Sequence, residues 1–235
     1  MPKMKKKILI AIGIIAILIV AIIAFMVVSD MIQEKKLMEE FQNVEGLTEK
    51  EDHETDEIKE ALERVITKGD YGKVETSYKQ YLKDVYGNME NISKILDDEK
   101  ITNSLTSENY KEDGPDFVTT KKYLTETKQS LEDGKNKYYE LLTEDGAMKY
   151  IKEQNLDSYY EDIYKNEIKA YINKEERDDK TVEESINDVI SVLSTSEKII
   201  NFLSENKGKW EIEDDSIVFD TQKLSDEYDN LTSEI

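Results

Sequence analysis

The chain has 235 residues, and its 53 Asp and Glu against 32 Lys and Arg give a formal net charge of −21. An acidic balance of this size repels nucleic acid and anionic lipid, so it excludes a protein that binds either one by bulk charge. The absence of cysteine excludes disulfides, thiol catalysis and a lipid attached to cysteine. With only two prolines, the composition favours helix throughout.

The first element in the chain is an uncharged apolar stretch, Ile8 to Val28. As a helix it would be about 31 Å long, which suffices to cross a hydrocarbon core of roughly 30 Å. We therefore predict a single N-terminal membrane-spanning helix. Four lysines precede it in residues 1–7, and this excess of lysine favours a cytoplasmic basic tail and an extracytoplasmic C-terminal part.

Two other interpretations of this stretch can be weighed from the sequence. A cleavable signal peptide has an apolar core of roughly 7–15 residues and an A-x-A pattern, whereas this stretch is longer and ends in Val27-Val28-Ser29. An uncleaved anchor is therefore favoured. A dimerising span would place small residues four apart, but Ala16 has Val20 at that spacing. Self-association through the span is not expected.

The acidic excess lies outside the predicted span. Setting aside the four N-terminal lysines leaves 28 basic against 53 acidic residues, a net charge of −25 for residues 29–235. Residues 29–57 are expected to form an acidic helical stalk or linker. His53, the only histidine, lies in a charged run of this linker, and we interpret it as a solvated side chain, not a metal ligand.

Apolar residues that recur every three or four positions predict an antiparallel helical bundle over residues 58–206. Turn signals at Gly69–Gly72 and Thr143–Gly146 separate its helices, and residues 97–116 are predicted to be irregular. The stripes expected to face inward are Leu37, Phe41 and Val44, ended by Gly46; Ile58, Ala61, Leu62, Val65 and Ile66; Val74, Tyr78, Tyr81, Val85, Met89, Ile92 and Leu96; Phe117, Leu124, Leu131 and Tyr138; Tyr160, Ile163, Tyr164, Ile168, Tyr171 and Ile172; and Val182, Ile186, Val189, Ile190, Leu193, Ile200 and Leu203.

These stripes differ in strength. Those of residues 74–96 and 182–203 are the most periodic and predict central helices, the second of which begins at a capping box, Thr181–Glu184. The stripe from Phe117 to Tyr138 is narrow because its members recur at sevens, which favours a helix at the edge of the bundle. Gly134 is expected to kink or end that helix.

The last segment, residues 207–235, changes character. Trp210 to Glu213 alternates between apolar and acidic residues, a turn signal follows, and Ile217 to Phe219 is β-branched and aromatic. This pattern predicts a small β-hairpin packed on the bundle, with Trp210 covering its end. Thr221, or the aspartate before it, can cap a short final helix. The fold class is therefore mainly α.

The residue types argue against most enzyme classes. One histidine and no cysteine exclude most Ser-His, thiol and zinc chemistry, and no glycine-rich phosphate loop is present. The triplets Glu-Asp-Gly lack the ligand spacing of an EF-hand. We therefore assign no catalytic residue, no cofactor-binding residue and no metal ligand, although a catalytic carboxylate pair stays open.

Tyrosine is abundant, with 14 residues. Tyr78 and Tyr81 lie on apolar stripes and are expected in the core, whereas Tyr139 and Tyr159 lie off their stripes and, with Trp210, are the candidate partner contacts. The favoured hypothesis is a non-catalytic, membrane-anchored extracytoplasmic protein that binds or scaffolds another envelope protein. The alternative is a binding module for a small ligand or cell-wall polymer in a cleft lined by tyrosine and acidic residues.

Overall fold

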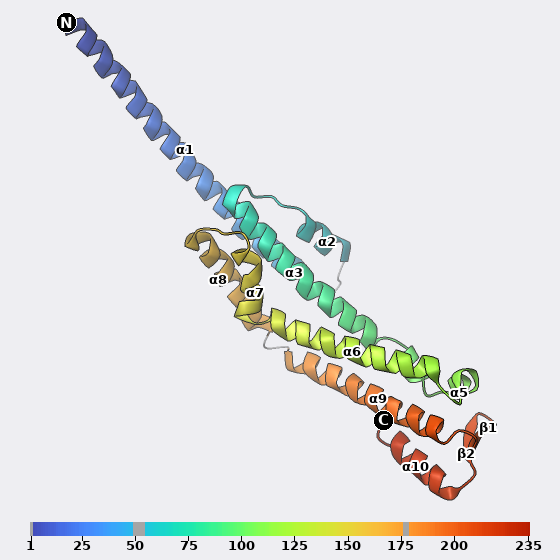
Figure 1. Cartoon of the computed structure of the whole chain (residues 1–235). Helices are drawn as coiled ribbons and strands as arrows, with labels where there is room; N and C mark the ends of the chain where they lie inside the picture. The colour runs from blue at the N-terminus through green and yellow to red at the C-terminus, as the bar shows by residue number, and fades with distance from the viewer. Residues whose placement is uncertain (1, 49–54, 176–178) are drawn as a thin grey trace. The chain divides into compact units, whose positions relative to one another are not determined.

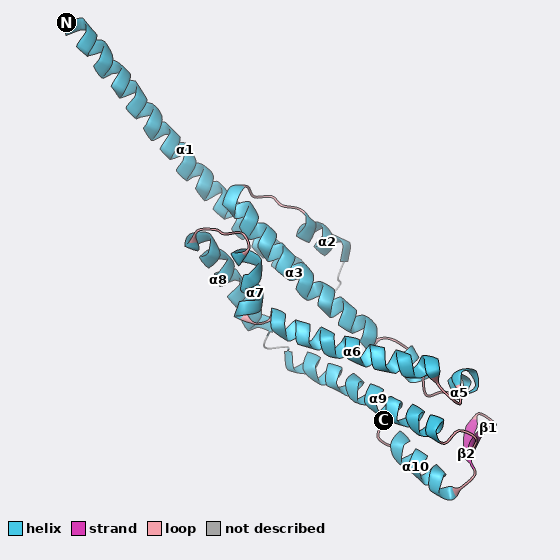
Figure 2. Ribbon diagram, in the orientation of Figure 1, coloured by secondary structure: helices cyan, strands magenta, loops and turns pink. Residues whose placement is uncertain are grey.

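The computed structural model describes the backbone of residues 2–48, 55–175 and 179–235, without side chains at residues 2–19, 22, 48, 55–56, 174–175 and 179–181. The described part is mainly α, with ten helices and one two-stranded antiparallel hairpin before the last of them (Figures 1 and 2). It divides into unit 1, Met1–Lys83 with Met148–Ile168, and unit 2, Asp84–Ala147 with Lys169–Ile235. The predicted mainly α class, the hairpin and the short final helix are confirmed.

Unit 1 is a group of helices packed around the second half of α1. The elements that contribute to it are α1 Pro2–Thr48, α2 Thr55–Glu63, the first part of α3 Gly69–Leu96, the end of α7 Glu144–Lys152 and most of α8 Ser158–Glu175. The stripe Leu37, Phe41 and Val44 is buried, and the Phe41 ring lies 4.4 Å from that of Tyr78. The helix continues through Gly46, where the sequence predicts an interruption, because this buried stripe holds the last turns in place.

Helix α3 begins earlier than the turn signal predicts. The glycines at 69 and 72 lie inside its first turn, and the turn itself occupies residues 64–68. Gly69 starts the helix at φ +62°, and a Cβ on Gly72 would lie 3.1 Å from the carbonyl oxygen of Thr67. The two glycines are therefore needed for the entry into the helix and its close approach to the preceding loop.

Unit 2 is built on a pair of antiparallel helices. Its elements are the second part of α3, α4 Lys100–Asn103, α5 Ser107–Asp113, α6 Val118–Leu141, the start of α7, the end of α8, α9 Asp179–Glu205, β1 Trp210–Glu213, β2 Ser216–Phe219 and α10 Gln222–Thr232. α6 and α9 run side by side in opposite directions (Figure 1), and Lys128 of α6 forms an ion pair with Glu197 of α9. Leu124 and Leu131 are fully buried, so α6 is a core helix of this unit, not the edge helix that its narrow stripe predicts.

Gly134 neither kinks nor ends α6. A Cβ at this position would lie 3.1 Å from Cγ1 of Ile92, and the Gly134 carbonyl oxygen accepts a hydrogen bond from Asn88 Nδ2 at 2.9 Å. The glycine therefore lets α3 approach α6 closely, and this packing offsets its low helix propensity. The stretch 97–116, predicted to be irregular, contains α4 and α5.

The C-terminal segment folds as predicted from its alternation. Trp210 pairs with Phe219 across the hairpin, and the two turn residues, Asp214 and Asp215, have φ values of 46° and 63°, as a type I′ turn requires. The Thr221 hydroxyl accepts a hydrogen bond from the N–H of Leu224 and caps α10.

Candidate functional site

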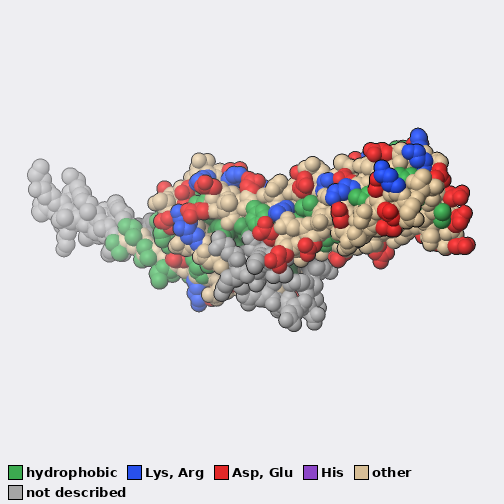
Figure 3. Space-filling model, turned by 90° about the horizontal axis from the view of Figure 1, so that it is seen from below, with side chains coloured by type: hydrophobic (Ala, Val, Ile, Leu, Met, Phe, Trp, Pro, Cys, Tyr) green, Lys and Arg blue, Asp and Glu red, His purple; other side chains and the backbone are tan. Residues whose placement is uncertain are grey.

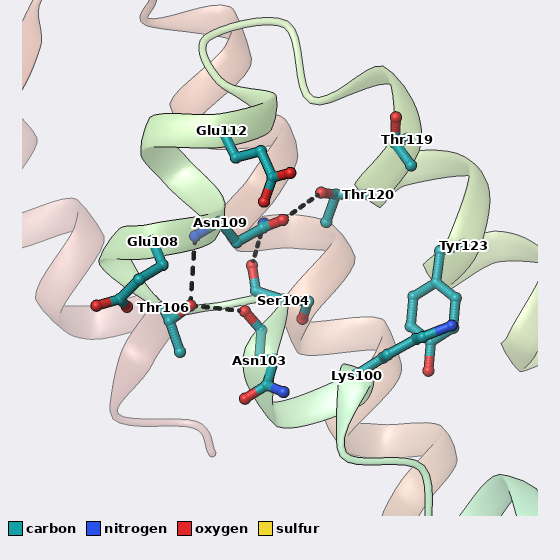
Figure 4. Close-up of a pocket in the computed structure, with 10 residues that line it drawn as sticks. All are labelled: Lys100, Asn103, Ser104, Thr106, Glu108, Asn109, Glu112, Thr119, Thr120 and Tyr123. Carbon is teal, nitrogen blue, oxygen red and sulfur yellow. Dashed lines mark hydrogen bonds between the residues drawn. The ribbon is translucent and has the colours of Figure 1, made fainter.

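One hollow in the described part of unit 2 is an open groove beside α4, α5 and the start of α6. It has a volume of about 600 Å³, and the side chains that line it carry hydroxyl, amide and charged groups (Figure 4). The residues that line it are Lys100, Asn103, Ser104, Thr106, Glu108, Asn109, Glu112, Thr119, Thr120 and Tyr123. We call this hollow the polar groove.

Asn109 holds the wall of the polar groove together. Its Nδ2 donates to the carbonyl oxygen of Ser104 at 2.8 Å, and its Oδ1 accepts from the hydroxyl of Thr120 at 3.1 Å (Figure 4). The Thr106 hydroxyl caps α5 by accepting from the N–H of Asn109. One amide side chain therefore ties α5 both to the residue that follows α4 and to the first turn of α6.

Asp113 fixes the start of α6 at the end of the polar groove. Its carboxylate accepts hydrogen bonds from the N–H of Thr120 at 2.7 Å and of Thr119 at 3.3 Å. Burial acts to raise the pKa of Asp113, but these hydrogen bonds together hold it below its ordinary value. The preceding Phe117 is fully buried at φ 54°, a conformation that bulky side chains rarely adopt, so packing determines the backbone here.

A second hollow, of about 240 Å³, adjoins the polar groove at Tyr123, which lines both. The Tyr123 hydroxyl donates to Asp98 Oδ2 at 2.7 Å. This hydrogen bond lowers the pKa of Asp98. The pKa of Tyr123 is raised, mainly by burial and to a smaller extent by the hydrogen bond to Asp98. The ring is thus held in place between the two hollows.

The polar groove presents groups that could contact a ligand. Its side chains offer hydrogen-bond donors and acceptors from Asn, Ser and Thr, negative charge from Glu108 and Glu112, and one aromatic face from Tyr123. Within the described residues, no group of three or more His, Cys, Asp or Glu is arranged to hold a metal ion. His53 lies outside the described residues. The groups that line the polar groove can form hydrogen bonds with a polar ligand.

The three candidate contact residues lie in separate local clusters. Trp210 is half-buried in unit 2, where its ring stacks on Phe117 at 6.0 Å and its Nε1 donates to the carbonyl oxygen of Leu203 at 2.8 Å. Tyr139, also half-buried, lies against Tyr138. In unit 1, Tyr159 is 47% exposed. Trp210 therefore packs over the end of α9, as predicted for a cap. The three residues that the sequence suggests as partner contacts have no local cluster in common.

Sequence patterns did not reveal the most buried polar cluster of the described residues, which lies in unit 1. Lys79 Nζ lies 2.6 Å from Glu40 Oε1 and 2.7 Å from Glu75 Oε1, and the three side chains are 2%, 3% and 0% exposed. Arg64 forms a bidentate pair with Glu40 through Nε and Nη2. The i, i+4 spacing of Glu75 and Lys79, in the helix that carries the most periodic stripe, was the only signal in the sequence. We call this set the ionic cluster.

The ionic cluster is fully hydrogen-bonded. The Glu75 carboxylate accepts from the backbone N–H groups of Ile66 and Thr67 and from the Thr67 hydroxyl, while Lys79 also donates to the carbonyl oxygen of Arg64. Burial acts to raise the pKa of Glu75, but Lys79 and the hydrogen bonds from Thr67 and Ile66 outweigh it and lower the pKa. The cluster ties α1 to α3 and to the loop between α2 and α3.

The described part of α1 before its buried stripe is apolar and exposed. Its exposed large side chains are Val20, Ile23, Phe25, Met26, Val27, Val28, Met31 and Ile32, with Phe25 at 74%. Figure 3 shows hydrophobic side chains gathered on this part of α1, whereas charged side chains are spread over the rest of the face in view. We call these residues the apolar collar.

No helix among the residues whose side chains are described is long and apolar enough to cross a membrane. Of the predicted span Ile8–Val28, residues 8–19 and 22 lie outside that set. The membrane-spanning helix therefore stays a prediction. Comparisons with protein-family models, with curated proteins and with solved structures find no match to this chain.

Proposed function

We propose that the chain is a single-pass, membrane-anchored protein of the cell envelope, non-catalytic, whose extracytoplasmic helical bundle binds or scaffolds another envelope protein. The observation that carries the anchor is the apolar collar. Its residues 25–28 are consecutive, large and exposed, so they cover every side of one helical turn. A helix that is apolar on all sides requires an apolar surround, and a bilayer provides one.

The collar continues the stretch Ile8–Val28, whose length matches the hydrocarbon core. The lysines of residues 1–7 favour a cytoplasmic N-terminus by their excess over the other flank. With the net charge of −25 that follows the span, the outer part would attract a partner with a basic surface.

Fractionation and proteolysis test the anchor. The full chain should stay in the membrane pellet after alkaline extraction, and protease added to protoplasts should digest the bundle while the N-terminal lysines stay protected. Release by alkaline extraction, or a mature N-terminus at Asp30, would contradict the anchor.

Cross-linking tests the partner. A photoreactive residue at Tyr139 should give one defined product in membranes, and salt at about 0.5 M should weaken it, because screening reduces attraction between exposed charges. The exposed Val118, in the same unit, is the matched control position. Equal products at both positions, or none at either, would contradict a specific partner at Tyr139.

The polar groove favours the second candidate function, an extracytoplasmic module that binds a polar small ligand or cell-wall polymer. Glu108 and Glu112 line it and are exposed, so both can be changed without opening the core. Purified cell-wall fragments should bind the full chain, and binding should fall in Glu108→Lys/Glu112→Lys. The matched control is Asp188→Lys/Glu205→Lys, which makes the same charge change on exposed residues of α9. Equal binding by both double variants would exclude the groove.

A further inference from the structure

One end of unit 1 lies beside the part of α1 that follows the apolar collar. The backbone N–H of Lys68, just before α3, donates to Gln33 Oε1 of α1 at 2.8 Å. Tyr71 in the first turn of α3 lies with its ring 5.0 Å from that of Tyr160 in the first turn of α8. Lys68 and the first turns of α3 and α8 therefore form one end of the unit, which we call the basal face.

The hydrogen bond between Lys68 and Gln33 places the basal face beside this part of α1. Burial is the main cause that raises the pKa of Tyr71 and of Tyr160, and the charge of Asp30 adds to both shifts. Asp30 and Gln33 follow the last residue of the predicted span, Val28, by two and five positions. At 1.5 Å per residue the basal face lies about 3–8 Å beyond the span.

This height coincides with the lipid headgroups. A bilayer has a hydrocarbon core of roughly 30 Å and a total thickness of roughly 40–45 Å, which leaves about 5–7 Å of headgroup region on each side. The ordinary tilt of a membrane helix, about 20°, shortens the height by less than a tenth. If α1 spans the membrane, the basal face cannot stand far above it.

Its chemistry fits that position. Tyr159 is 47% exposed, and its ring lies 5.3 Å from that of Tyr160. Met31 and Ile32 of α1 are exposed at the same level. Tyrosine, with an apolar ring and a polar hydroxyl, is enriched at the boundary between membrane and water. This explains why the Tyr159 ring is exposed beside the half-buried Tyr160 on an otherwise charged protein.

We propose that the basal face of unit 1 rests on the outer surface of the bilayer, with the Tyr159 and Tyr160 rings at the level of the lipid headgroups. The contact is aromatic, not electrostatic, so it requires no anionic lipid, in keeping with the acidic charge of the chain. Unit 1 is thereby held at the membrane and is not raised above it on a stalk. This inference rests on the membrane anchor of the proposed function.

Spin labels can measure the height of each position directly. The chain has no cysteine, so single-cysteine variants of the full chain can be labelled with a nitroxide and reconstituted in phosphatidylcholine vesicles. Tyr159→Cys and Lys68→Cys report the basal face from two elements. Phe25→Cys reports the predicted span, and Asn43→Cys, exposed on α1 about 22 Å beyond Val28, reports the aqueous side.

Collisions with oxygen increase, and collisions with a water-soluble nickel chelate decrease, as a label enters the membrane. The collision rate with the chelate at positions 159 and 68 should be at most about half the rate at position 43. It should still exceed the rate at position 25. Suppose that the label at 25 is shielded from the chelate, but the labels at 159 and 68 are as accessible to it as the label at 43. This result would overturn the proposal and leave the anchor intact. A label at 25 as accessible as the label at 43 would instead overturn the anchor.

Discussion

Lys79 and Glu40 are 39 residues apart in the chain, yet the Lys79 ammonium lies 2.6 Å from the Glu40 carboxylate in a site closed to solvent. A buried charge is tolerated only where it is paired and hydrogen-bonded, and each of these two groups also has a second charged partner, Glu75 for Lys79 and Arg64 for Glu40. The pair joins α1 to α3. It therefore selects one register between these helices, which apolar stripes alone would leave less sharply defined.

Lys79→Met should destabilise the chain strongly. The substitution leaves the buried Glu75 carboxylate without its cation and leaves Glu40 with Arg64 alone. Breaking such a cluster costs about 3–5 kcal/mol. Thermal unfolding of the full chain in detergent, followed by circular dichroism, measures the loss. Lys94→Met is the control, since it removes an exposed i, i+4 pair with Glu90 that contributes less than about 0.5 kcal/mol. Equal losses in the two variants would show that the ionic cluster contributes no more than a surface pair.

Glu75 should make the stability of unit 1 depend on acid pH. Its folded-state pKa is lowered, so its contribution is fully present above the unfolded value of about 4.3 and is lost as the pH falls through the folded pKa. The melting temperature of the wild type should exceed that of Glu75→Gln at pH 6, and the difference should narrow toward pH 3. Exposed Glu99→Gln should change the melting temperature little at either pH. A difference in melting temperature that widens as the pH falls would contradict a lowered pKa of Glu75 in the folded state.

Trp210→Ala should lower the stability of the chain by more than about 1 kcal/mol, because a buried large side chain contributes about 1.5–3 kcal/mol and Trp210 is half-buried. The change also leaves the Leu203 carbonyl without the Nε1 donor. Wild-type tryptophan emission should be blue-shifted and resist quenching. Val218→Ala, on the exposed face of the same hairpin, should cost less than about 0.5 kcal/mol. Red, readily quenched emission with unchanged stability would make Trp210 a partner contact instead.

Two helix glycines should respond differently to alanine. Gly87 lies within α3 with nothing within 4 Å of an added Cβ, so Gly87→Ala should stabilise the chain by about 0.5–1 kcal/mol through helix propensity. At Gly134 the added Cβ would lie 3.1 Å from Ile92, and the displacement of that side chain offsets the gain. Urea unfolding of both variants compares them. A larger gain at Gly134 than at Gly87 would contradict the close packing of α3 on α6.

The sequence alone determined most of the side chains that face inward. The prediction is wrong for Val65 and Ile66, which are 49% and 39% exposed because α2 ends at Glu63. Tyr78, Tyr81, Leu124 and Leu131 are buried as their spacing predicts, and the alternation around Asp214 gives the hairpin. This works because a periodic stripe is a local property. A helix repeats every 3.6 residues and a strand every two, so the spacing of apolar residues determines which face of the segment is apolar, wherever the segment lies in the fold. Apolar character alone likewise marks Ile8–Val28 as a candidate span, without any tertiary contact.

Only the tertiary structure decided where polar side chains are buried. The pattern of apolar and polar residues assigns the charged Glu75 and Lys79 to the surface. Nothing near them in the sequence indicates that Glu40 lies within hydrogen-bonding distance of Lys79. The polar groove likewise depends on Asn109. Its amide joins Ser104, within the stretch that the sequence predicts to be irregular, to Thr120 in the next helix. Burial of a charge or an amide becomes favourable only when a specific partner replaces its water, and that partner is supplied by the fold, not by the spacing of neighbours along the chain.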